Sequence, residues 1–141
     1  MPGTDLIQRV PKLFLQELTF TGATGEPGDT GGAYTVATVT GQVLITHLSA
    51  FCTTLLAGGS ATVELGTANN TAELIAQTTA TDIDANEFWL SATPEVEATN
   101  AIVNKLVGAD IILTTATADV TAGVIKVAML WTPLSEGGNL G

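Results

Sequence analysis

Apolar and polar side chains alternate in a series of short stretches along the chain, and turn residues separate one stretch from the next. In residues 13–20, Phe14, Leu18 and Phe20 fall on one face of an extended strand. The same pattern returns in residues 61–67, 72–79, 87–92, 110–117 and 124–134. A period of two is typical of β-strands with one face toward a core, so the chain is expected to be built mainly of strands.

Residues 34–56 are too long for one ordinary strand. Gly41 interrupts them and predicts a bulge or bend between two segments. Strict alternation leaves both faces of the second segment largely apolar, although the core of an antiparallel sandwich covers only one face of a sheet. We expect a second subunit to cover the other face. The candidate oligomer-interface residues are Val43 and Ile45 on one face and Leu44 and Leu48 on the other.

Residues 93–107 are compatible with two local structures. Thr93 fits the cap of a helix, with Pro94 at the first helical position. A loop followed by a short strand fits the same residues. The chain is therefore expected to contain at most one short helix.

A glycine recurs at every third position in residues 22–31, GATGEPGDTG, which is the period of a collagen triple helix. A triple helix needs many repeats, because its chains carry no internal hydrogen bonds. Glu26-Pro27-Gly28-Asp29 also has Pro and Gly in positions that suit a turn. The stretch is interpreted as a long, acidic, flexible loop between two strands.

The short strands and their turn residues predict an all-β fold, an antiparallel β-sandwich in its jelly-roll version. Three regions are expected along the chain. Residues 1–12 form an extended N-terminal arm, residues 13–135 the sandwich domain, and residues 136–141 a flexible C-terminal tail.

The composition narrows the possible partners. Hydrophobic residues make up 45% of the chain and charged residues 13%, and the formal net charge is −10 with four basic residues. No basic patch can be built from these four, so we expect no binding to nucleic acid and none to an anionic membrane surface. Residues 30–63 carry no charge, yet glycines and polar side chains interrupt them, so they are interpreted as strands and not as a membrane helix.

The chain offers little for catalysis. Cys52 is the only cysteine and His47 the only histidine. Cys52 is expected to be a buried small apolar residue and His47 a structural one, because each lies in an apolar strand run. We therefore predict that the protein is not an enzyme and that it needs no cofactor.

One cluster has the spacing of a metal site. Asp82, Asp84 and Asn86 are placed like the first three ligands of a calcium loop, but Glu87 stands where that loop needs glycine and Thr93 where it needs a bidentate glutamate. The alternative is a solvated polar turn or strand edge. Asp84 and Glu87 have the residue types of the paired carboxylates of glycoside hydrolysis, but the sequence offers no cluster of exposed aromatic residues to hold a sugar.

The remaining aromatic and polar positions favour a structural role. Trp89 and Trp131 have apolar neighbours in strands and are expected in the core. The polar strand faces carry Thr, Ala and Gln in place of Lys and Glu, so another protein can cover them without desolvating charge.

The stretch FCTTLLAGGSATVELGTANNTAELIAQTTATDIDANEFWLSATP, followed by DIILTTATADVTAGVIKVAMLWTPLS, resembles small structural proteins encoded by tailed bacteriophages and prophages. The similarity covers roughly residues 30–135. It implies a virion component, commonly a trimer or dimer that decorates or cements the capsid. It also implies the major capsid protein as partner and a location on the capsid surface after synthesis in the cytoplasm of the bacterial host.

The leading hypothesis is therefore a capsid decoration or cement protein whose N-terminal arm lies along the coat. The candidate capsid-contact residues are Arg9, Lys12 and Phe14. Two alternatives stay open: a head-tail or tail accessory protein, and a carbohydrate-binding module on the virion surface.

Overall fold

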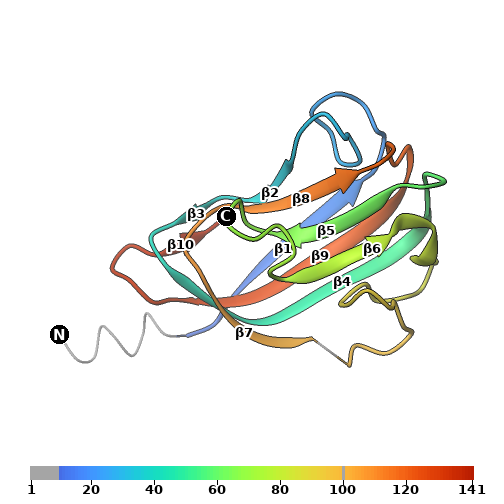
Figure 1. Cartoon of the computed structure of the whole chain (residues 1–141). Coiled ribbons are helices and arrows are strands. Elements are labelled where there is room, and N and C mark those ends of the chain that lie inside the picture. The colour runs from blue at the N-terminus through green and yellow to red at the C-terminus, as the bar shows by residue number, and fades with distance from the viewer. Residues whose placement is uncertain (1–9, 100) are drawn as a thin grey trace.

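A computed structural model describes residues 10–99 and 101–141 of the chain, and Figure 1 shows that they form two stacked sheets. The described residues contain ten strands and one 3-10 turn, η1. Their bounds are β1 Lys12–Thr19, β2 Tyr34–Ala37, β3 Val39–Thr40, β4 Val43–Ala57, β5 Thr62–Gly66, β6 Ile75–Thr79, η1 Ala80–Asp82, β7 Ile102–Val107, β8 Ile111–Ala116, β9 Ala122–Pro133 and β10 Asn139–Leu140.

The first sheet has the strand order β1-β9-β4-β7, and the second has the order β2-β8-β5-β6. All neighbours within both sheets are antiparallel, and β3 pairs with β10 in a small separate ladder. Successive strands mostly change from one sheet to the other. The predicted antiparallel β-sandwich is confirmed.

The core lies between the two sheets and is filled by the inward-facing residues of both. Leu18 of β1, Leu48 of β4 and Leu65 of β5 are fully buried, and Trp89 from the η1–β7 segment is buried with them. Complete burial of one such aliphatic side chain contributes about 1.5–3 kcal/mol. The core contains one contiguous apolar cluster, so the sandwich holds together without a disulfide.

A bulge in β4 changes the expected facing of its side chains. Ile45 pairs with Trp131 and His47 with Leu130, so Thr46 is an extra residue on β4. One extra residue reverses the alternation, and Leu48 therefore joins Val43 and Ile45 on the inner face. All three are 0% exposed and lie in the core, so assigning them to an oligomer interface was wrong.

Residues 87–92 do not form the regular strand that the sequence predicts, so that prediction is wrong. Phe88 makes only isolated bridges, with Phe51 and Glu95. The segment nevertheless runs along the edge of β4, through hydrogen bonds from Asn86 N to Cys52 O (2.8 Å), Cys52 N to Glu87 O (2.9 Å) and Trp89 N to Ala50 O (2.8 Å). Of the two structures considered for residues 93–107, the loop followed by a strand is confirmed, since β7 follows the loop.

The loop over residues 22–31 is tied down and is not the flexible loop that the sequence predicted. Pro27 and Gly28 are buried. The Val120 amide donates to the Gly28 carbonyl (2.9 Å), and both the amide and the hydroxyl of Thr30 donate to Asp119 Oδ1 (2.9 and 2.8 Å). The glycines therefore allow the loop to pack closely on the β8–β9 turn.

The two ends of the chain differ from their expected regions. Residues 136–141 were expected as a flexible tail, but β10 pairs with β3, Leu140 is buried, and Gly141 and Thr38 exchange two backbone hydrogen bonds of 2.8 and 2.9 Å. Residues 1–9 of the expected N-terminal arm lie outside the described residues. The last residue of that arm, Lys12, already belongs to β1.

Candidate functional site

Cys52 and His47 do not form a nucleophile–base pair, because they lie on opposite faces of β4. Cys52 pairs with Ile125 on the buried inner face, whereas His47 pairs with the exposed Leu130 on the outer face. The thiol donates a hydrogen bond to the carbonyl of Thr54 (Sγ–O 3.2 Å). Cys52 is a buried apolar residue, as predicted.

Burial raises the pKa of the Cys52 thiol above its ordinary value. The hydrogen bond to Thr54 opposes this rise, and the negative charges of Glu87 and Asp84 add to it. A raised pKa keeps the thiol protonated at neutral pH, and the protonated thiol is a weak nucleophile and a poor metal ligand.

The calcium candidates Asp82, Asp84 and Asn86 lie on two successive turns, not on one extended strand face. Asp82 ends η1, and Asp84 begins a turn in which the Glu87 amide donates to the Asp84 carbonyl (3.3 Å). The Glu87 carboxylate accepts from the Asp84 amide (3.0 Å), so it closes the turn. No group of three His, Cys, Asp or Glu side chains in the described part of the chain is placed to hold a metal ion.

Both tryptophans are core residues, as predicted. Trp89 is 0% exposed, and its Nε1 donates to Thr78 Oγ1 (2.8 Å). Trp131 is 3% exposed, and the Lys12 Nζ lies 5.2 Å from its ring centroid. Neither indole is available as an exposed platform for a sugar ring.

The three capsid-contact candidates are in different situations. Arg9 lies outside the described residues. Lys12 is exposed at the start of β1. Phe14 is half-buried and packs against the core from the inner face of β1, so only part of its ring is free for contact with another protein.

The outer face of the first sheet carries leucines where a solvated sheet carries polar side chains. Leu13 and Leu15 on β1 are 59% and 67% exposed, Leu106 on β7 is 53% exposed and Leu130 on β9 is 36% exposed. Cross-strand pairing brings Leu13 beside Leu130 and Leu106 beside the partly buried Leu44. We call the five residues Leu13, Leu15, Leu44, Leu106 and Leu130 the leucine face.

The leucine face has a hollow in it. Leu15 pairs with Ala128, which in turn pairs with Ser49, so two small side chains follow the large one across the sheet. The rows on either side carry larger side chains, Leu13 with Leu130 on one side and Glu17 with Lys126 on the other. A shallow depression lies over Ala128, bordered by Leu15, Glu17 and Lys126.

The outer face of the second sheet has the opposite character. Its side chains are mainly hydroxyls, amides and one carboxylate, and several bond to each other. Gln77 Nε2 donates to Thr62 Oγ1 (3.2 Å), and Thr71 Oγ1 donates to Glu64 Oε1 (3.0 Å). This face follows the usual apolar-in, polar-out pattern, so the first sheet is the exception.

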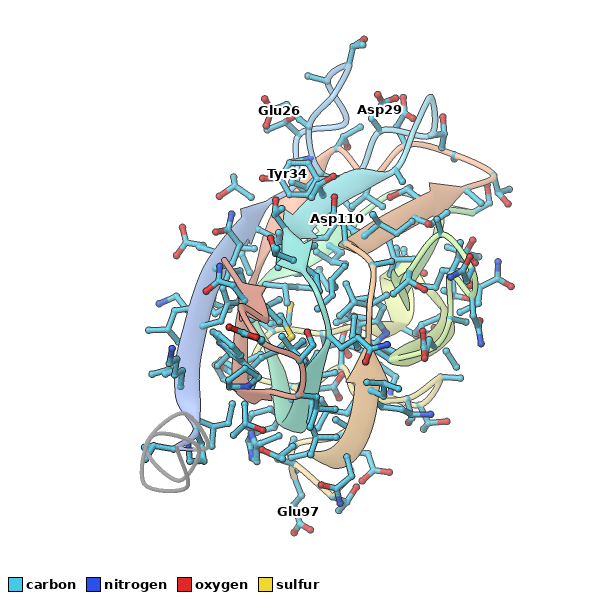
Figure 2. The ribbon with its side chains drawn as sticks, turned by 90° about the vertical axis from the view of Figure 1, so that its left-hand side faces the viewer. Glu26, Asp29, Tyr34, Glu97 and Asp110 are labelled. Atoms are coloured by element: carbon cyan, nitrogen blue, oxygen red, sulfur yellow. The ribbon has the colours of Figure 1, made fainter. Side chains whose placement is uncertain are left out.

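Charges are also segregated between strands and loops. All three lysines of the described residues lie on strands of the first sheet, and Glu17 is the only acidic residue on those strands. Apart from Glu17 and Glu64, the acidic residues of the described chain lie in η1 and in loops. Figure 2 shows Glu26 and Asp29 at the top of the molecule and Glu97 at the bottom.

Sequence reasoning missed four of the five leucines of this face. The available signal lay in residues 13–18, where Leu13 and Leu15 alternate with Phe14 and Leu18, so both sides of the strand are apolar. The same property was recognised in residues 43–52, but there the bulge moves the apolar residues into the core.

In comparisons with known proteins, no protein-family model, curated protein or solved structure matches the chain. Within the described residues, no helix has the length and apolar character needed to cross a bilayer.

Proposed function

We propose that this protein is a structural component of a tailed-phage virion, a decoration protein that binds the outer surface of the capsid and stabilises the shell. The observation that carries this proposal is the leucine face on the first sheet. The resemblance of residues 30–135 to phage structural proteins supplies the setting, and the exposed leucines supply a surface made for contact with protein.

The leucine face favours protein contact for an energetic reason. Burial of apolar surface is worth about 25 cal/mol per Å², so covering side chains as exposed as Leu13 and Leu15 contributes roughly 1 kcal/mol or more each. Exposed apolar clusters on soluble domains are typical of interaction surfaces. Weak contacts of this kind become strong when several copies are linked to one another, because the linked copies then bind the shell at several sites together.

The site geometry favours binding over catalysis. Cys52 is buried on the inner face, His47 lies on the outer face, and the carboxylate of Glu87 is engaged in a turn. A carbohydrate-binding module is disfavoured by the burial of Trp89 and Trp131, because such modules present aromatic rings to the sugar.

We also infer that the sandwich is a jelly roll. Without the two-residue strands β3 and β10, the remaining eight strands count from first to eighth along the chain. One sheet then has the order first, eighth, third, sixth, and the other has the order second, seventh, fourth, fifth. This order supports a chain folded as two nested Greek keys, which defines the jelly roll and is a common architecture of viral shell domains.

Binding to shells that lack the protein tests the proposal. Purified chain is mixed with such shells, and the bound fraction is measured by co-sedimentation along with the shells' resistance to heat. We expect saturable binding and a higher disruption temperature. Shells that bind none of the protein and gain no resistance would overturn the proposal.

Matched leucine and valine substitutions test the role of the leucine face. Leu13→Ser with Leu15→Ser removes the two most exposed leucines, and Leu134→Ser with Val96→Ser removes exposed apolar side chains elsewhere (52% and 73% exposed). We expect the first pair to lose most shell stabilisation and the second pair to keep it. Equal loss in both pairs would show that the leucine face has no special role.

A further inference from the structure

We infer that the β1–β9 part of the leucine face, with Leu13, Leu15 and Leu130, packs against the same part of a second copy of this chain, across a twofold axis that runs along the strands between β1 and β9. This inference deepens the proposed function and rests on its premise that the leucine face is a protein contact. It names the occupant of that face, which the function leaves open.

Charge favours a second copy at this face over the parts of the surface formed by the loops. The loops that surround the two sheets carry nearly all the acidic residues of the described chain and no lysine. Two copies that approach through these loops repel each other, because like charges meet. On the outer face of the first sheet, Glu17 and Lys126 lie side by side and cancel, so two copies can approach there without repulsion.

The cross-strand register makes the face self-complementary. A twofold axis between β1 and β9 places β1 of one chain over β9 of the other. Each β1 side chain then faces, on the second copy, the β9 residue with which it pairs within its own chain. Glu17 then faces Lys126 of the second copy, and Lys126 faces its Glu17. Two ion pairs form at once, which is the repetition that an isologous interface requires.

The relief of the face fits the same axis. Leu15, the most exposed of the five leucines, lies over the hollow at Ala128 of the second copy, and Leu13 lies over Leu130. Leu15 of each chain thus enters the hollow of the other chain, and Leu13 of each chain contacts Leu130 of the other. Sheets that pack face to face with aligned strands are a common arrangement, at a separation of about 10 Å.

The size of the contact sets its strength. Two strands about 4.8 Å apart and eight residues long at about 3.4 Å per residue cover roughly 260 Å² per chain. This is below the area of a standard stable interface, about 800 Å² per partner. The pair is therefore weak in free solution, and a shell that holds neighbouring copies close together raises its occupancy.

Charge reversal tests the pairing. Glu17→Lys and Lys126→Glu each create two like-charge contacts in a homodimer, whereas Glu17→Lys with Lys126→Glu restores two opposite pairs. Association is measured by sedimentation equilibrium at about 10–500 µM, a range suited to a weak contact. We expect each single variant to associate at least about tenfold more weakly than the native chain, and the double variant to recover.

Mixing the two single variants provides the sharpest comparison. The Glu17→Lys chain presents two lysines and the Lys126→Glu chain two glutamates, so they are expected to form a heterodimer although neither forms a homodimer. A native chain that is monomeric at every concentration, or a dimer that both single variants leave unchanged, would overturn the inference. Circular dichroism of each variant confirms that it is folded.

Ala128→Leu distinguishes the packing of Leu15 into the hollow from non-specific hydrophobic association. The substitution adds apolar surface but fills the hollow that Leu15 of the second copy enters. We expect weaker association, whereas stronger association would contradict the fitted contact. A chain that stays monomeric yet binds and stabilises shells overturns only the second-copy inference, and a dimer that binds no shell overturns only the proposed function.

Discussion

Gly28 is the position where one added methyl group tests the packing of the glycine loop most severely. Its φ is +93°, in the region that favours glycine, and a Cβ built there runs into the carbonyl oxygen of Val120. The same residue accepts the hydrogen bond from the Val120 amide (2.9 Å). Gly28→Ala therefore cannot be accommodated without separating the loop from the β8–β9 turn.

The expected cost has two parts. A left-handed conformation costs a residue with a Cβ about 1–2 kcal/mol, and forcing atoms into a packed site costs about 1–3 kcal/mol more. Gly28→Ala should therefore destabilise the protein by about 2–5 kcal/mol. For a chain of 141 residues, a loss near 3 kcal/mol lowers the melting temperature by roughly 10 °C.

Two glycines of the same loop provide matched controls. Gly25 has a φ of +79° but nothing within 4 Å of its added Cβ, so Gly25→Ala should cost only the backbone part, about 1–2 kcal/mol. Gly32 has neither a positive φ nor a neighbour, so Gly32→Ala should be neutral or slightly stabilising. Urea denaturation of the three variants measures the differences, and a Gly28→Ala protein as stable as Gly25→Ala would refute the packed loop.

Three further predictions concern other parts of the molecule. Leu48→Ala should lower the free energy of unfolding by about 2–5 kcal/mol and Leu44→Ala by well under that, because the bulge buries only Leu48. Urea denaturation measures both losses, and equal losses would contradict the register of β4. Hydrogen bonds from the Thr30 amide and hydroxyl hold the pKa of Asp119 below its ordinary value of 3.8, so this carboxylate stabilises the fold above that pH and its contribution is lost as pH falls through the lowered pKa. The stability advantage of the native chain over Asp119→Asn should therefore shrink between neutral pH and about pH 2, and an advantage that grows on acidification would contradict the assignment. Iodoacetamide should modify Cys52 far more slowly in the folded protein than in urea, as followed by mass spectrometry, and equal rates would contradict its burial.

The class of fold and most strands follow from the sequence, because a period of two fixes both the element type and the core face wherever the alternation is unbroken. Residues 13–20 and 110–117 illustrate this: β1 and β8 lie within one residue of the expected bounds. Residues 61–67 and 72–79 show the same alternation, and β5 and β6 lie within them.

The sequence-based predictions were wrong where contacts between residues far apart in the chain determine the local structure. Thr46 becomes a bulge because of pairing with β9, more than eighty residues away, and no local pattern indicates it. The glycine loop and the last residues contain turn residues typical of flexible segments, yet the loop is fixed by Asp119 and Val120 and the end of the chain by β3.

Residues 13–18 carry a signal for part of the leucine face, but the sequence does not show which other residues complete it. Leu13, Leu106 and Leu130 are far apart in the chain and become neighbours of one surface only when the strand order is known. The prediction that the protein is not an enzyme rests on the sequence alone, which contains a single histidine and a single cysteine.

A cryo-electron microscopy map of virions that carry this chain would test the proposed decoration of the capsid. We expect sandwich-shaped density in regular array on the outer shell, with the leucine face covered by protein and not by solvent. Virions without this density, or sandwiches whose leucine face points into open solvent, would contradict it.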